Sequence, residues 1–237
     1  IESKNLMSDK FNEIYQKSIK NPEKFWKDAS EDIFWFKKPS KILNKSNPPF
    51  YKWYEDGVTN TCYNALDIHI DQGKGNKTAL IYDSPITGNK SKFTYEELRS
   101  KVSKFAGALK DQGINKGDRV IIYMPMIPEA VVAMLACARI GAIHSVVFGG
   151  FASNELASRI DDSKAKLLVT ASCGFEPGRT VEYKPLVDEA IKQAQHKISK
   201  MILFQRKGHE VKLNAPMEIS WDEAHANAKD TDCVEMN

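Results

Sequence analysis

The chain has 237 residues, of which 42% are hydrophobic and 27% are charged, as is typical of a globular protein with one large domain or two small ones. Lysine and arginine (34) only slightly outnumber aspartate and glutamate (31), so we do not expect the basic face of a nucleic-acid-binding protein. No stretch reaches the roughly 18 apolar residues that a membrane-spanning helix needs, so no membrane partner is expected.

The cysteines and the N-terminus bear on the compartment. The four cysteines form no C-x-x-C pair, so neither a zinc site nor a thioredoxin-like centre is predicted, and a reducing compartment fits best. Cys137 lies in an apolar helical run and is interpreted as a small core residue. Residues 1–20 contain no apolar segment of the signal-peptide kind. Because the chain begins with Ile1, we expect a processed or truncated N-terminus.

Residues 1–60 differ from the rest of the chain in their aromatic content, because they carry three of the four tryptophans: Trp26, Trp35 and Trp53. The spacing of apolar residues over 11–19 predicts a helix, which the Asn21-Pro22 pair ends. Pro22 then begins a second short helix. We interpret this region as an extension that packs its aromatic side chains on a larger body.

Beyond residue 60, strands and helices are expected to alternate. A helix is predicted near 63–70, and the Pro- and Gly-containing segment 84–89 predicts a hairpin loop. A capping box, Thr94 to Glu97, opens a helix that Gly113 ends. The expected strands are 78–82, 120–124, 143–147, 166–170 and 201–204, and further helices are expected over 128–138, 153–162 and 183–196. This alternation predicts an α/β fold with a mainly parallel sheet and helices on both of its faces.

The tail, residues 205–237, is more polar. A short strand or loop is expected near 211–213, and a second S-x-x-E box, Ser220 to Glu223, predicts a short helix. We place residues 1–60 in an N-terminal extension and residues 61–237 in a single α/β subdomain.

In an open parallel sheet, ligands bind beyond the carboxyl ends of the strands. Three such ends are visible, at residues 124–128, 147–151 and 170–179. Gly149-Gly150 permits two interpretations: a tight turn between core phenylalanines, or a site where the backbone approaches a flat ligand with Phe148 as a packing surface. Arg179 is either a solvated surface residue or a phosphate contact.

His144 falls within an apolar strand pattern and is interpreted as a core histidine rather than a catalytic base. The chain contains no G-x-G-x-x-G after the first strand of the sheet, no P-loop motif, no G-x-S-x-G and no H-E-x-x-H. The residues alone therefore predict an α/β domain with a ligand-binding edge at 148–179.

A family resemblance adds to this interpretation. Residues 116–151, KGDRVIIYMPMIPEAVVAMLACARIGAIHSVVFGGF, resemble the signature of acetyl- and propionyl-CoA synthetases, the AMP-forming short-chain acyl-CoA synthetases. Residues 15–26, 63–69 and 93–98 are similar to the same family, so the resemblance covers essentially the whole chain. It implies that a short-chain carboxylate and ATP-Mg²⁺ give an acyl-adenylate, which CoA converts to acyl-CoA and AMP.

The resemblance also implies a CoA-binding edge. Its members in this sequence are Phe148, Gly149, Gly150, Glu176, Pro177, Gly178 and Arg179. Many acetate-type members have an arginine where this chain has Glu176, and a carboxylate there repels a phosphate. The segment 176–186 is more similar to the propionate-type branch, so propionate is the expected acyl donor, with acetate second.

The resemblance places the remaining machinery after Asn237. We expect the phosphate loop, the ATP and Mg²⁺ sites, the acyl pocket and the adenylation lysine there, so this chain should hold no catalytic residue or metal ligand and should be inactive alone. The alternatives are a non-catalytic CoA- or nucleotide-binding module, and an adenylate-forming enzyme for another acid. The cytoplasm and the mitochondrial matrix are equally compatible with the sequence.

Overall fold

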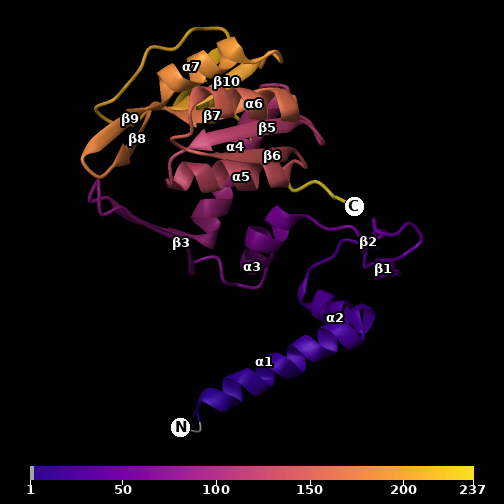
Figure 1. Cartoon of the computed structure of the whole chain (residues 1–237). Helices are drawn as coiled ribbons and strands as arrows, with labels where there is room; N and C mark the ends of the chain where they lie inside the picture. Colours follow the sequence, from indigo (N-terminus) through magenta and orange to yellow (C-terminus); the bar gives the residue numbers. More distant parts are fainter. Residues whose placement is uncertain (1–2) are drawn as a thin grey trace. The chain divides into compact units, whose positions relative to one another are not determined.

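The computed structural model describes the backbone of residues 3–237 and the side chains from residue 9 onward, and it divides into two compact units (Figure 1). The first unit runs to Thr59 and also contains Glu235–Asn237, while the second is Asn60–Val234. Within the first unit, backbone hydrogen bonds of 2.8 and 2.9 Å join Thr59 to Met236.

The first unit is helical at its start and irregular afterwards. It contains α1 (Ser3–Lys20), α2 (Pro22–Ala29), a 3₁₀ turn (Ser30–Asp32) and a two-stranded antiparallel ribbon of β1 (Leu43–Asn44) and β2 (Lys52–Trp53). The Asn21 side chain caps α2, accepting from the backbone of Lys24 at 3.1 Å. Several aromatic side chains are exposed, namely Phe11, Tyr15, Trp26, Phe50, Tyr51 and Trp53. Their packing on a larger body remains a prediction.

The second unit is built on a five-stranded sheet in the order β11-β10-β7-β5-β6 (Figure 1). Every pairing in it is parallel, which confirms the predicted fold class. The strands are β5 (Arg119–Met124), β6 (Ile143–Phe148), β7 (Leu167–Ala171), β10 (Lys200–Phe204) and β11 (Glu218–Ser220).

Helices cover both faces of this sheet, as predicted. The helices are α4 (Tyr95–Asp111), α5 (Pro128–Arg139), α6 (Ser153–Ser163), α7 (Tyr183–Gln193) and α8 (Trp221–Asn227). Residues alternate along β5: Val120 and Ile122 join the core with α4, α5 and α8, whereas Ile121 and Tyr123 join the core with α6 and α7. A strand buried on both faces has no polar side, which explains its continuous apolar sequence.

Smaller elements flank the sheet. A π-helical turn (Tyr63–Asp67) leads into α3 (Ile68–Asp71), and β3 (Thr78–Asp83) pairs with β4 (Lys90–Thr94) in the predicted hairpin. Both expected capping boxes are sites of N-capping, because Thr94 accepts from Glu97 and Ser220 from Glu223. Cys137 is fully buried, as expected.

Two sequence-based expectations need correction, and one strand was missed. The segment 211–213 is a loop, one of the two expected alternatives, and the unpredicted strand β11 lies later, where three residues gave too short a pattern to recognise. Residues 173–182 form an antiparallel hairpin of β8 (Cys173–Glu176) and β9 (Arg179–Glu182) rather than a simple loop. His144 is exposed, because β6 is an edge strand of the described sheet and only one of its faces is covered by the core.

Candidate functional site

A cleft of about 360 Å³ opens at the carboxyl ends of the central strands. Its walls come from the β3–β4 loop, the turn after β5, the end of β6, the β8–β9 hairpin and the segment after β10, and they include Thr87, Met124, Phe148, Gly149, Glu176 and Arg206. From β5 the chain passes to β6 on one side and then crosses to β7 on the other. Such a reversal of strand order is where open α/β sheets bind ligands.

Gly149 and Gly174 make room for one tyrosine. A Cβ atom on Gly149 would lie 2.3 Å from the Tyr183 hydroxyl and 2.8 Å from the Met124 carbonyl oxygen, and a Cβ on Gly174 would lie 2.6 Å from the same hydroxyl. Neither glycine can therefore gain a side chain without moving Tyr183. The ring forms part of the cleft wall, and burial raises the pKa of Tyr183 to about 12.

Tyr123 holds the turn that follows β6 through two hydrogen bonds of its hydroxyl group. Its hydroxyl donates to the Phe151 carbonyl at 2.8 Å and accepts from the Gly150 amide at 3.2 Å. Gly150 has a φ of 110°, a conformation that favours glycine. Burial raises the pKa of Tyr123, so the phenol stays protonated and available as a donor.

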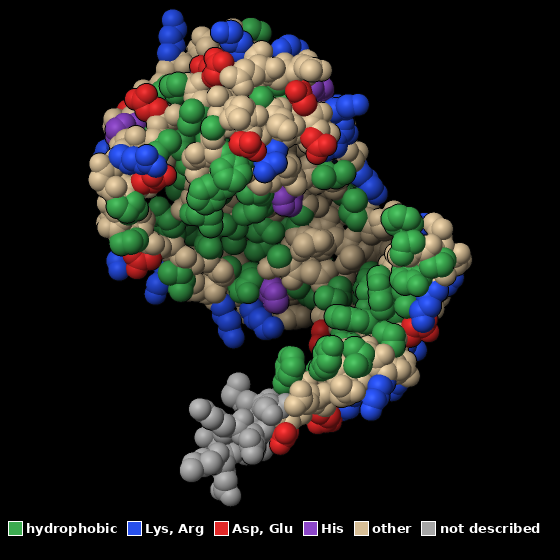
Figure 2. All heavy atoms as spheres, viewed as in Figure 1, with side chains coloured by type: hydrophobic (Ala, Val, Ile, Leu, Met, Phe, Trp, Pro, Cys, Tyr) green, Lys and Arg blue, Asp and Glu red, His purple; other side chains and the backbone are tan. Residues whose placement is uncertain are grey.

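The two phenylalanines of this turn are not core residues. Phe148 is 68% exposed and Phe151 is 38% exposed, and their rings lie 5.6 Å apart. Figure 2 shows hydrophobic side chains gathered on the face of the α/β unit where β6 and α5 lie in Figure 1. Exposed apolar side chains of β6 contribute to its surface: Ile143, Val146 and Phe148. The core interpretation of the phenylalanines is wrong, and Phe148 remains available as a packing surface.

The β8–β9 hairpin carries an ion pair at its tip. The Arg179 guanidinium donates to the Glu176 carboxylate, with Nε–Oε2 and Nη2–Oε2 distances of 2.7 and 2.6 Å. The Arg179 side chain is 70% exposed and that of Glu176 is 38% exposed. Gly178, at a φ of 75°, makes the tight turn between the two strands. The carboxylate expected to repel a phosphate thus neutralises the neighbouring arginine in this structure.

Arg206, which sequence reasoning missed, lines the same cleft, beside the β8–β9 hairpin. It is 9% exposed, and its guanidinium lies 4.7 Å from the centroid of the Phe175 ring. No described residue gives this guanidinium a hydrogen bond or an ion pair. The bonded groups of Arg206 belong to its backbone: the amide donates to Ser172 Oγ at 2.8 Å, and the carbonyl accepts from the His209 amide at 2.9 Å. Among the described residues, every side-chain nitrogen or oxygen that is closed off from solvent has a hydrogen-bond partner. The guanidinium nitrogens of Arg206 have no partner, so they are accessible to solvent, and Arg206 lines the cleft.

The structure brings most of the predicted edge together. Phe148, Gly149 and Glu176 line the cleft, and a Cβ on Gly150 would lie 3.6 Å from Glu176 Oε1. Gly178 and Arg179 line an adjoining shallow cavity of about 480 Å³, which shares Glu176 with the first. Pro177 is exposed and lines neither cavity.

The cleft itself has no metal-ligand geometry. Among the described residues, one group of side chains has metal-ligand spacing, Cys62 with Asp67 and Cys233, away from the cleft. Mg²⁺ prefers oxygen ligands, so a group with two sulfur atoms does not fit it. None of the described helices combines the length and apolar character needed to cross a membrane.

Comparisons with known proteins agree with this architecture. Residues 68–234 match the AMP-binding enzyme family, and residues 11–65 match the acetyl-coenzyme A synthetase N-terminus. The chain is 55% identical over 218 residues to the human mitochondrial acyl-CoA synthetase short-chain family member 3, covering 92% of this chain and 32% of that protein. It is 43% identical over 214 residues to acetyl-coenzyme A synthetase of Streptomyces avermitilis, covering 90% of this chain and 32% of that protein.

A solved structure shares the fold. Acetoacetyl-CoA synthetase from Streptomyces lividans superposes with a TM-score of 0.82 at 23% identity, over 93% of this chain and 33% of that one. The chain thus spans about a third of the length of the relatives it matches. With most of its α/β unit matched by this family, the chain belongs to the AMP-binding enzyme family, and its first unit matches the N-terminus of acetyl-coenzyme A synthetases.

Proposed function

We propose that this chain is the N-terminal part of a ligase that converts a short-chain carboxylate, ATP and CoA to acyl-CoA, AMP and pyrophosphate through an acyl-adenylate. The observation that carries the proposal is the cleft at the strand-order reversal, where a buried arginine without an internal partner faces the predicted CoA edge. The similarity over 92% of the chain to a short-chain acyl-CoA synthetase supports the same reaction.

In this proposal the cleft holds the nucleotide part of CoA. Gly149 and Gly150 have no side chains, so a ligand can approach the backbone beside Phe148. The exposed Phe148 ring offers a flat apolar surface to the adenine base of CoA. Arg206 and Arg179 supply positive charge on two sides, and a guanidinium matches phosphate oxygens in geometry. The chain's own part is thus to bind and orient CoA.

Arg179 must exchange its partner to take part. An exposed ion pair contributes only about 0–1 kcal/mol. Exchanging the Glu176 carboxylate for a phosphate therefore costs Arg179 little. Glu176 then remains as a competing anion, which weakens the CoA site relative to one with an arginine at this position.

The substrate acid and the compartment extend the proposal. We propose propionate as the preferred acid and acetate as the second, because the segment 176–186 resembles the propionate-type branch more than the acetate-type branch. A relative named as mitochondrial favours the mitochondrial matrix over the cytoplasm. Mg²⁺, ATP and the acid are proposed to bind parts of the whole enzyme outside this chain, because the chain spans only about a third of the length of its relatives.

An assay of the intact protein tests this function. Purified protein is incubated with ATP, Mg²⁺, CoA and either acetate, propionate or butyrate, and AMP and acyl-CoA are both measured. The expected result is AMP release that requires CoA and acid, with the highest kcat/KM for propionate. Absence of AMP release with every acid would refute the ligase, and a preference for a longer acid would refute the substrate. The isolated 237-residue chain serves as the control and should be inactive.

A non-catalytic CoA-binding module is the second candidate, favoured by the fact that the candidate site contains arginines and glycines but no acid, base or nucleophile assigned to chemistry. Calorimetry with CoA distinguishes the two. Weak binding by the isolated chain fits the ligase proposal, in which the edge is one part of a larger site. Tight binding without any ligase activity of the intact protein would favour the module.

A further inference from the structure

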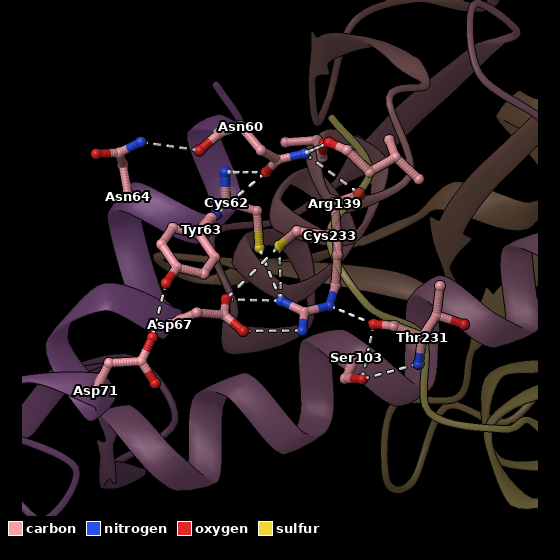
Figure 3. A network of polar contacts seen from close by, with 12 residues as sticks. Asn60, Cys62, Tyr63, Asn64, Asp67, Asp71, Ser103, Arg139, Thr231 and Cys233 are labelled. Carbon is pink, nitrogen blue, oxygen red and sulfur yellow. Dashed lines mark hydrogen bonds and ion pairs between the residues drawn. The ribbon is translucent and has the colours of Figure 1, made fainter. Parts of the chain in front are cut away.

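A second polar centre lies away from the cleft, between α3, α5 and the C-terminal end of the α/β unit (Figure 3). Arg139 is 3% exposed at the end of α5, and its guanidinium forms a two-pronged ion pair with Asp67 at 2.8 and 2.9 Å. Two sulfur atoms complete its surroundings: Cys62, fully buried, and Cys233, half-buried. The proposed function assigns no role to these cysteines.

The two cysteines are held together by contacts on both sides. Cys233 belongs to the C-terminal strap, residues 228–234, which has no regular secondary structure and crosses α4 and the end of α5. The Thr231 amide donates to Ser103 Oγ at 2.9 Å, and the Val234 amide donates to the Arg139 carbonyl at 2.9 Å. The strap is therefore anchored two residues before Cys233 and one residue after it.

Asn60 connects the strap to the backbone of the other cysteine. Its side-chain oxygen accepts from the Cys62 amide at 2.8 Å, and its side-chain nitrogen donates to the Val234 carbonyl at 2.8 Å. One side chain thus positions the residue next to Cys233 and the backbone of Cys62 itself (Figure 3). As a result, both sulfur atoms and the Asp67 carboxylate lie within 4.8 Å of one another.

A metal ion does not fit this group, although its spacing suggests one. The same nitrogen, Arg139 Nη1, lies 2.8 Å from Asp67 Oδ2, 3.1 Å from Cys233 Sγ and 3.6 Å from Cys62 Sγ. The guanidinium therefore already stands where a cation would be coordinated, and it supplies the positive charge. A second buried cation beside it would be repelled.

The same geometry suits thiol oxidation. A positive charge beside a thiol favours the thiolate, which is the reactive form, and two adjacent thiols can close a disulfide. The thiol hydrogen bond from Cys233, together with the Arg139 guanidinium, lowers the pKa of Cys62, while the same hydrogen bond and burial raise the pKa of Cys233, so Cys62 is the thiol that reacts first. The other two cysteines lack such a setting: burial alone raises the pKa of Cys137 to about 12.

We propose that Cys62 and Cys233 form a reversible disulfide that fastens the C-terminal strap to the start of the α/β unit when the protein meets hydrogen peroxide. One thiolate attacks the peroxide O–O bond, giving a sulfenic acid and, after protonation, water. The second thiolate attacks that sulfur and expels hydroxide, which takes up the proton released by the second thiol. Two thiols and one peroxide thus yield one disulfide and two waters.

The native contacts are compatible with closure. The two sulfur atoms start within 4.8 Å of each other, and Asn60, Thr231 and Val234 hold the two backbones beside one another. Arg139 loses its two sulfur contacts but keeps Asp67 and the Thr231 carbonyl. Oxidation therefore leaves no buried charge without a partner.

Peroxide titration of the intact protein tests the proposal. Reduced protein is treated with hydrogen peroxide under native conditions, quenched with catalase, unfolded in the presence of N-ethylmaleimide, digested and analysed by mass spectrometry. We expect two of the four thiols to escape alkylation, with a cross-linked peptide that contains Cys62 and Cys233 and is lighter by two hydrogens. Dithiothreitol should restore both thiols. Full alkylation of both cysteines, or sulfinic acid at Cys233 without a cross-link, would overturn the proposal.

Variants separate this pair from general oxidation. Cys233→Ser should abolish the cross-link and leave a sulfenic acid at Cys62, which dimedone traps. Cys137→Ala is the matched control, since it removes a buried cysteine without a neighbouring sulfur, and it should cross-link as the wild type does. Stoichiometric zinc that survives dialysis in the wild type but not in Cys233→Ser would show a metal site instead and would refute the disulfide.

Discussion

Two buried arginines of the α/β unit are surrounded very differently. Arg139 has every part of its guanidinium engaged by Asp67, the Thr231 carbonyl and two sulfur atoms. Arg206 is 9% exposed, its guanidinium lies beside the face of Phe175, and its nitrogens have no hydrogen-bond partner among the described residues. Because none of these nitrogens is sealed from solvent, water in the cleft supplies their acceptors, and a phosphate can replace that water. The surroundings of Arg139 are typical of an arginine that stabilises the fold, and those of Arg206 are typical of an arginine in a ligand site.

The comparison predicts the largest loss of stability at the first arginine. Arg139→Met leaves the Asp67 carboxylate buried without its counter-ion, and breaking a buried pair in this way costs about 3–5 kcal/mol. Urea denaturation followed by circular dichroism should show the unfolding midpoint fall accordingly. The double variant Arg139→Met/Asp67→Leu should recover most of that loss, because it removes both charges. A double variant as unstable as the single one would show that the pair is not what stabilises this region.

Substitution of Arg206 should have the opposite result, with a small effect on stability and a large effect on the KM for CoA. Arg206→Ala removes only a cation–π contact, worth about 0.5–2 kcal/mol, so its effect on unfolding should be small. Under the proposed function it also removes a charged contact worth about 1.5–3 kcal/mol, which should raise the apparent KM for CoA about 10- to 100-fold. Steady-state kinetics of the intact enzyme give the KM for CoA and the KM for ATP. An equal rise in the KM for ATP would contradict the assignment to CoA. The KM for CoA of Arg206→Lys should lie between those of the wild type and Arg206→Ala.

A third substitution tests whether the cleft wall is built around Tyr183. Gly149→Ala places a methyl group 2.3 Å from the Tyr183 hydroxyl, and overpacking of this kind costs about 1–3 kcal/mol. In a Tyr183→Phe background the hydroxyl is absent, so the same substitution should cost less. Some loss should persist, because the Met124 carbonyl oxygen remains 2.8 Å from the new atom. Equal costs in both backgrounds, measured by urea denaturation, would mean that Tyr183 does not set the need for glycine.

The difference between the two arginines also marks the limit of sequence reasoning. Periodicity and capping residues predicted the sheet, its parallel pairing and most helices, because these depend on neighbours along the chain. Arg206 follows β10 within a polar segment that shows no pattern, and only the fold brings it into the same cleft as Glu176. The contacts of Arg139 likewise join residues far apart in sequence. His144 failed for the same reason, since an edge position is a property of the whole sheet.

The smallest effect is expected at Arg179, whose ion pair with Glu176 is exposed and can be exchanged for a contact with a ligand. In Glu176→Gln the amide no longer competes as an anion, so Arg179 becomes available to a phosphate. The exposed pair is worth about 0–1 kcal/mol, so the KM for CoA should fall by up to about fivefold, with the KM for ATP unchanged.

Arg179→Ala supplies the matched control for Glu176→Gln. It should raise the KM for CoA more than that for ATP, and in its background Glu176→Gln should have a smaller effect. A higher KM for CoA in the Glu176→Gln single variant would mean that the carboxylate positions Arg179 for its ligand rather than competing with that ligand. Glu176 would then belong to the same structural category as Asp67, as a carboxylate that holds an arginine in place.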